Sequence, residues 1–287
     1  MVLESFLNPA AAKRHPIETF FLGVLYSVIG LFLAYWVFRD YSSLTLVFLI
    51  TLAAAPLLYF TVASEERADA ALASERAILK EHSKVFLFLM SLFLGITVSL
   101  ALLYVFLPAD MVSVLFSSQT QTIASINNQI SGSISGAAAA RSDIFLRIFL
   151  NNVRVLIFSI LFSVLYGIGA LFILTWNASV IAAAIGNSIR SHLASTAQAI
   201  GLEKVGGYLH VFSFGFLRYA LHGLPEVFAY FVGGLAGGIL SVALIRNDLI
   251  GEKRERILLD VAGLTLLALG VLLIAAFLEV YVTPFFF

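Results

Sequence analysis

The sequence has 287 residues, of which 61% are hydrophobic and 12% are charged, and its formal net charge at pH 7 is +0. Soluble domains carry about a quarter charged residues, so this composition excludes an ordinary soluble domain and indicates a membrane protein. The balanced charge argues against nucleic acid as a partner, because that ligand requires a basic surface. The chain contains no cysteine, which excludes disulfides, thiolate metal sites and a cysteine nucleophile.

Apolar runs long enough to cross a bilayer follow one another along the chain. A transmembrane helix needs about 20 mostly apolar residues. The runs that meet this length are residues 17–38, 44–62, 85–107, 152–176, 224–245 and 257–282. The first run is too long for the apolar core of a signal peptide, so we expect it to be retained. Together the runs predict an all-α fold, a polytopic transmembrane helical bundle.

The region between the fourth and fifth runs predicts an irregular crossing. It holds two short apolar stretches, 178–189 and 207–220, separated by charged residues. Each stretch is too short to cross a bilayer comfortably, so we expect the two to form one broken crossing or a re-entrant pair. The bundle would then have about six to seven membrane-embedded segments.

Lysine and arginine gather before the first run and in residues 63–84 and 246–256, whereas residues 108–140 have neither. Because positive charge marks cytoplasmic loops, we expect the N-terminus inside, segment 108–140 outside and, after about seven crossings, the C-terminus outside. Arg141 and Arg147 do not fit this scheme. Residues 1–84 would be an N-terminal transmembrane helix pair plus a charged cytoplasmic helix, and residues 85–287 a second transmembrane domain.

Two polar segments leave alternatives open. The charged segment 63–84 predicts a cytoplasmic helix capped by Ser64, and we favour a solvated connector over a docking face. The external segment 108–140 fits an amphipathic helix on the membrane surface and, equally, a flexible loop. The helical spacing that suggests the first alternative is that of Ile123, Ile126, Ile130 and Ile134.

A histidine and a carboxylate stand four residues apart at the start of the fifth run. His222 and Glu226 lie on one face if this segment is helical, and Pro225 is expected near the helix start. The favoured interpretation is a polar cap at the outer interface with Arg218 and His210 nearby. The alternatives are a proton-relay pair, an ion site or a contact point for a partner helix, since ionisable groups in membranes are often functional.

Four glycines in the fifth run form two overlaid GxxxG pairs. Gly233 pairs with Gly237, and Gly234 pairs with Gly238. This spacing bares the backbone for close helix packing, whereas a phosphate-binding loop would need a following lysine that the run lacks. The motif leaves open whether the partner helix belongs to this chain or to another.

Polar residues also mark the ends of two other runs. Asn152 stands at the head of the fourth run and Asn177 at its end, where caps and turns are expected. Arg154 lies inside that run, so its side chain should snorkel to the interface or pair with Glu226 or Glu279. These residues, with His222 and Arg218, make up the candidate functional polar cluster.

Motifs that would indicate an enzyme are missing from the sequence. It has no HExxH, no Walker loop and no GxSxG, so we expect no catalytic residue, no bound metal and no cofactor. An intramembrane hydrolase built from Ser188 or Ser213 with His222 is the least favoured hypothesis.

Residues 85–287 resemble the stage II sporulation protein M (SpoIIM) family of integral membrane proteins. The matching elements, in chain order, are Phe149-Leu150-Asn151-Asn152, Asn177, His222-Gly223-x-x-Glu226, the glycine-rich span and Glu279-x-Tyr281-x-x-Pro284. The chain departs from the family pattern at Leu221, where a proline is common, and in the added residues 1–84. The added segment makes it similar to the extended archaeal forms.

The resemblance implies a scaffold without a reaction of its own. The bacterial member is a polytopic protein that brings a peptidoglycan-degrading machine to the septal membrane. We therefore expect a membrane scaffold or assembly component whose partners are the lipid bilayer and other membrane proteins, with oligomerisation possible. The alternative is a transporter, channel or lipid-handling protein with its site near His222 and Glu226.

Overall fold

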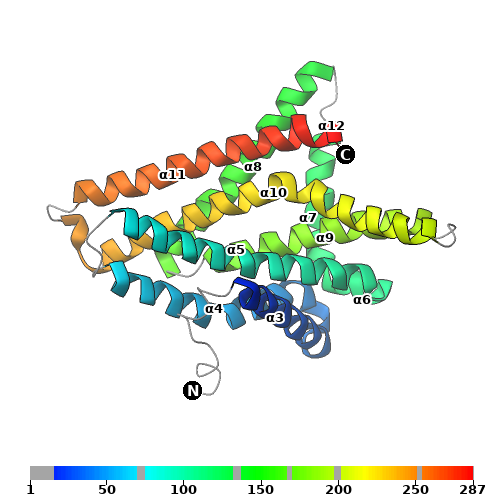
Figure 1. The fold of residues 1–287 in the computed structure, drawn as a ribbon, viewed down its shortest axis with the longest axis horizontal. Coiled ribbons are helices and arrows are strands. Elements are labelled where there is room, and N and C mark those ends of the chain that lie inside the picture. The colour runs from blue at the N-terminus through cyan, green and yellow to red at the C-terminus, as the bar shows by residue number, and fades with distance from the viewer. Residues whose placement is uncertain are drawn as a thin grey trace.

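The computed structural model describes residues 16–69, 75–131, 137–166, 170–196, 202–250 and 254–286. These residues are almost entirely helical and contain no strand. Seven helices among them are long and apolar enough to span a membrane. Most of these helices run in roughly the same direction and pack side by side (Figure 1). The prediction of an all-α transmembrane bundle with about six to seven membrane-embedded segments is therefore confirmed.

The first three spans are α3 (Pro16–Val37), α4 (Ser42–Asp69) and α5 (Glu75–Phe106), with the short turn η1 (Arg39–Tyr41) between the first two. Helices α3 and α5 approach closely at two glycines. A Cβ atom on Gly23 would collide with the backbone of α5, and one on Gly95 would collide with the Phe20 carbonyl of α3. The close contact holds α3 against the rest of the bundle.

The sequence analysis predicted a separate helix in the charged segment 63–84. The described residues of this segment belong instead to two long helices. Helix α4 continues through Ser64 to Asp69, and α5 begins at Glu75. The predicted cap at Ser64 is wrong, because Ser64 lies inside α4 and not at the start of a helix. The side chains of residues 58–85 lie outside the described part of the structure.

The polar segment 108–140 contains two helices, α6 (Ala109–Leu115) and α7 (Ser117–Ser131). Residues 117–131 are therefore helical, as the first alternative predicts, and Ile134 lies outside the described residues. Figure 1 shows α7 running across the direction of the long helices. Its Gln119 side chain is fully buried, accepts a hydrogen bond from Ser43 of α4 (2.7 Å) and donates one to Ser179 of α9 (3.1 Å). A polar bridge therefore joins α7 to two spans.

The fourth apolar run, 152–176, is not a single span. Helix α8 (Ala137–Tyr166) ends within it and α9 (Ala170–Thr196) begins within it. The short stretches 178–189 and 207–220 belong to α9 and to α10 (Leu202–Ile245), so the predicted broken crossing is absent from the described residues. The charge of Arg190, which suggested the break, is accommodated inside α9, where its guanidinium donates to the Tyr104 carbonyl (3.3 Å).

Helix α10 is 44 residues long and contains Pro225 in its interior. Figure 1 shows that α10 bends near its middle, where this proline lies. The turn η2 (Asp248–Ile250) leads to α11 (Arg254–Phe277), which continues into the π-helical turn η3 (Leu278–Val282) and then α12 (Thr283–Phe286). Helices α10 and α11 pack extensively against each other, and because a short connection joins them, they run antiparallel.

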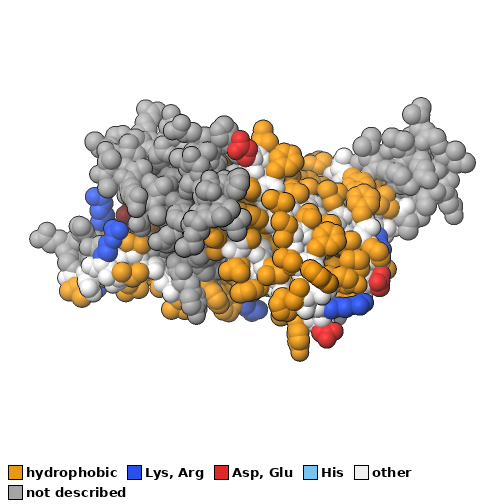
Figure 2. All heavy atoms as spheres, turned by 90° about the horizontal axis from the view of Figure 1, so that it is seen from below, with side chains coloured by type: hydrophobic (Ala, Val, Ile, Leu, Met, Phe, Trp, Pro, Cys, Tyr) orange, Lys and Arg blue, Asp and Glu red, His pale blue; other side chains and the backbone are white. Residues whose placement is uncertain are grey.

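The surface of the described residues suits a lipid environment. Large apolar side chains such as Phe21, Phe48 and Leu266 are exposed on several spans. Figure 2 shows one face on which apolar side chains predominate and the few visible charged groups lie toward the margins. Lipid, rather than water, is the solvent that this surface fits.

Candidate functional site

The candidate site lies on one face of α10, where His222, Glu226 and Tyr230 follow one another at intervals of four residues. His222 and Tyr230 are buried and Glu226 is partly buried. The Glu226 carboxylate accepts a short hydrogen bond from the Asn152 amide of α8 (2.6 Å). This bond joins two of the residues that the sequence analysis placed in the polar cluster.

The end of the last span supplies the opposite side of the site. The Thr283 hydroxyl lies 3.5 Å from Nδ1 of His222. Because α10 and α11 are antiparallel, Glu226, four residues after His222, lies at the level of Glu279, four residues before Thr283. The two carboxyl groups are close enough to interact electrostatically, and both act on the Tyr230 hydroxyl.

Both carboxyl groups stand where the helix backbone is irregular. Pro225 precedes Glu226 and has no N–H to donate to the previous turn. Glu279 belongs to the π-helical turn η3, whose Leu278 carbonyl accepts a hydrogen bond from the Thr283 hydroxyl (3.0 Å). Such irregular turns redirect side chains and occur often at functional sites.

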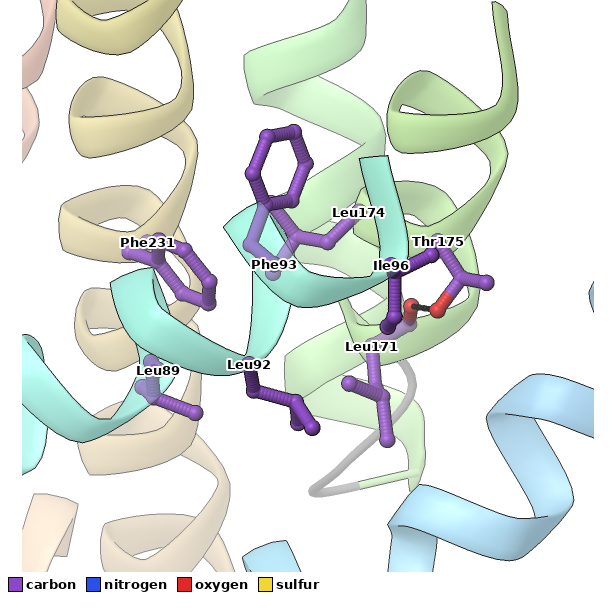
Figure 3. A pocket seen from close by; sticks show the side chains of 8 residues that line it. All are labelled: Leu89, Leu92, Phe93, Ile96, Leu171, Leu174, Thr175 and Phe231. Carbon is purple, nitrogen blue, oxygen red and sulfur yellow. Dashed lines mark hydrogen bonds between the residues drawn. The ribbon is translucent and has the colours of Figure 1, made fainter. Parts of the chain in front are cut away.

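Small apolar cavities lie near the cluster and do not include its carboxylates. One cavity of about 10 Å³ lies between α5, α9 and α10 and has room for about one water molecule (Figure 3). Its one polar side chain, Thr175, donates to the Leu171 carbonyl of its own helix (2.8 Å). A second cavity of about 20 Å³ borders Tyr219 and Gly223. Neither is lined by Glu226 or Glu279.

Three residues of the predicted polar cluster do not join the Asn152–Glu226 centre. The exposed Arg218 acts electrostatically on His222 and Tyr219, so it lies at the edge of the site. Arg154 is exposed and forms no ion pair with Glu226 or Glu279 in the described structure. Asn177 lies inside α9 rather than at a helix end, and its amide donates to the Ile173 carbonyl (2.9 Å).

The glycine ridge packs within this chain. A Cβ atom on Gly233 would meet the Leu156 side chain of α8, and one on Gly237 would meet the Ile160 carbonyl of the same helix. Gly234 faces Ala170, whereas nothing lies within 4 Å of a Cβ placed on Gly238. The ridge thus fixes α8 against α10, next to the Asn152–Glu226 hydrogen bond.

A comparison with known protein families shows to which of them the chain is related. The sequence model described as stage II sporulation protein M matches residues 24–284. The chain belongs to the stage II sporulation protein M family. The match begins at residue 24 rather than near residue 85, so most of α3 and all of α4 lie within the matched region. No curated protein and no solved structure matches the chain.

The sequence analysis did not identify two residues of the site, Tyr230 and Thr283. Tyr230 continues the spacing of His222 and Glu226 by one further turn, and this spacing was the signal that could have revealed it. Thr283 could not be found in this way, because its contact with His222 depends on how α10 and α11 pack. The buried Gln119 was missed for the same reason.

The geometry offers no support for the hydrolase hypothesis. Within the described residues, neither Ser188 nor Ser213 forms a hydrogen bond with His222, whereas the Thr283 hydroxyl lies 3.5 Å from its Nδ1 atom. No group of three or more histidine, aspartate and glutamate side chains is placed to hold a metal ion in the same residues.

Proposed function

We propose that this membrane protein is a scaffold or assembly component without a reaction of its own. The observation that carries the proposal is the direct contact within the polar cluster: Asn152 donates to Glu226, and the small cavities nearby are apolar. A transporter needs polar groups that face a path for its substrate. A scaffold needs a firmly packed bundle that presents fixed surfaces to other proteins, and close glycine packing supplies that rigidity.

We also propose that the N-terminus is cytoplasmic and the C-terminus external. The proposal is supported by the number of candidate spans, because a chain that crosses a membrane seven times has its termini on opposite sides. The basic residues Arg246, Arg254 and Arg256 lie in the connection between the last two spans and at the start of α11, and all three are exposed. The positive-inside rule assigns this connection to the cytoplasm, together with the connection between α4 and α5.

The scaffold proposal is tested by identifying the proteins that accompany the chain. The tagged full-length protein is crosslinked in native membranes, solubilised in mild detergent and isolated, with an unrelated seven-span protein of similar abundance as the control. The expected result is a fixed set of membrane proteins enriched over the control, with and without the crosslinker. A chain that remains alone under both conditions contradicts the proposal.

A second function, transport, is favoured by one observation: two carboxyl groups meet where both helices are irregular. Ion sites of transporters often lie at such discontinuities. The test is flux into proteoliposomes that contain the wild-type protein or Glu226→Gln. Transport through this site requires a flux that the substitution abolishes; no flux, or a flux that Glu226→Gln leaves unchanged, excludes it.

A further inference from the structure

The outer face of α8 carries a charge that the described residues of the bundle do not neutralise. Arg154 is exposed, as is its neighbour Asn151 one turn earlier on the same face. The rest of the face consists of exposed apolar side chains, namely Leu150, Ile157, Phe158, Leu161 and Leu165. The opposite face, with Asn152 and Leu156, is buried against α10.

The position of Arg154 along the helix makes its exposure costly. The exposed ion pair of Asp143 and Arg147 (3.0 Å) marks the polar end of the span. Arg154 lies about 10 Å further along α8, and about 17 Å from Leu165 at the other end of the span. An arginine at such a depth costs about 3 kcal/mol or more when it faces lipid, so it normally has a partner.

The described part of this chain does not offer that partner. Glu226 lies near the middle of its span and Glu279 lies at the level of Glu226, and both are partly buried where α8, α10 and η3 meet. The other acidic side chains that the structure describes lie between helices or within the first two turns of one. Within the described residues, a second copy of the chain therefore presents no exposed carboxylate at the depth of Arg154.

We propose that this face of α8 binds a transmembrane helix of a different protein, and that this helix carries an aspartate or glutamate at the depth of Arg154. The proposal rests on the scaffold function and names the chemistry of one partner. The partner's carboxylate neutralises Arg154, Asn151 offers it an amide hydrogen bond, and the flanking apolar residues pack against the remainder of the helix.

A photo-crosslinking amino acid at position 157, one turn from Arg154, tests the proposal in native membranes. Ile274 of α11, exposed to 58% against 57% for Ile157, is the matched control position. The expected result is an adduct with one membrane protein at position 157 and none with it at position 274. Arg154→Leu should reduce this adduct about tenfold or more, whereas Arg154→Lys and the end-of-helix variant Arg256→Leu should retain it.

The chemistry of the partner is tested on the captured helix itself. The helix must contain an aspartate or glutamate whose neutralisation removes the adduct, and Arg154→Glu must be rescued when that carboxylate is replaced by arginine. Folding does not confound Arg154→Leu, because removing a charge from a lipid-facing position favours insertion.

Other outcomes overturn the proposal. Adducts with lipid alone indicate that the Arg154 side chain snorkels to the interface. An adduct of twice the chain's mass indicates that a second copy occupies this face. An adduct that Arg154→Leu leaves unchanged indicates a purely apolar contact. These results leave the scaffold function standing if other proteins still accompany the chain. A chain that is alone in native membranes contradicts both proposals.

Discussion

Asn151 and Asn152 are sequence neighbours with opposite surroundings. Asn152 is buried and donates to Glu226, whereas Asn151 is exposed on the outer face of α8. Asn152→Ala leaves the partly buried Glu226 without this donor and should lower the free energy of unfolding by about 1–3 kcal/mol. Thermal unfolding of the purified protein in one detergent measures the change.

Asn151→Ala is the control for this prediction. A surface substitution away from the core should change the free energy of unfolding by less than about 0.5 kcal/mol. Equal effects of the two substitutions would show that the Asn152–Glu226 hydrogen bond contributes nothing particular to stability.

At this scale, the sequence predicts which residues are unusual better than it predicts their partners. Ionisable and amide groups within apolar runs are conspicuous, which is how Asn152, Glu226 and Glu279 were recognised. Their pairing depends on how α8, α10 and α11 pack, which no local pattern encodes. Arg154 illustrates the limit: of its two expected alternatives, snorkelling to the interface or pairing with Glu226 or Glu279, the pairing is not formed in the described structure, and the side chain is exposed.

The contact between α8 and α10 depends on glycines with unequal roles. Gly237 leaves no room for a Cβ atom beside the Ile160 carbonyl, whereas Gly238 faces open space. Gly237→Ala should therefore destabilise the protein by about 1–3 kcal/mol through overpacking. Gly238→Ala should be neutral or stabilise by up to about 1 kcal/mol, because alanine favours helix formation.

Denaturation of the two glycine variants under identical conditions checks this difference. The opposite order of stabilities, or the same loss in both, would mean that the glycine ridge does not lie against α8. The GxxxG spacing predicted close packing correctly, but only the fold identifies which pair of glycines makes the contact.

The helix α7 is held to the spans by a polar bridge rather than by apolar packing alone. Gln119→Leu removes the hydrogen bonds to Ser43 and Ser179 and leaves both hydroxyls with one fewer partner. We expect about 1–3 kcal/mol of destabilisation and faster amide hydrogen exchange in α7. Gln121→Leu changes an exposed side chain of the same helix and should leave exchange unchanged; similar exchange in both variants would contradict the bridge.

Helix boundaries were the least predictable elements, for a physical reason. Apolar composition continues from Asn152 to Trp176, across the point where α8 ends and α9 begins, so hydropathy alone joins two helices. Conversely, Pro225 suggested a helix start, yet α10 continues through it. Packing against α8 and α11 compensates for the missing backbone hydrogen bond, as occurs in membrane helices.

At the scale of the whole molecule, the number of crossings was predictable although two boundaries were not. Every crossing must hydrogen-bond its own backbone polar groups and therefore forms a helix of about 20 apolar residues. The total apolar length of the chain thus limits the number of spans. The sequence analysis counted α8 and α9 as one span, which made the predicted number one too low. It also counted residues 178–220 as an additional broken crossing, which brought the number back to seven. The predicted number of spans was therefore correct despite both errors, and the opposite placement of the termini stays a prediction.

The proposed orientation is directly testable because the chain contains no cysteine, so any introduced thiol is unique. Asp110, at the start of α6, and Glu255, at the start of α11, are both exposed and lie in connections expected on opposite sides of the membrane. In intact cells, a membrane-impermeant maleimide should label Asp110→Cys and spare Glu255→Cys. Permeabilisation should then expose the second thiol. The reverse pattern would place the N-terminus outside, and labelling of both thiols in intact cells would mean that the connections before α6 and α11 share one side of the membrane.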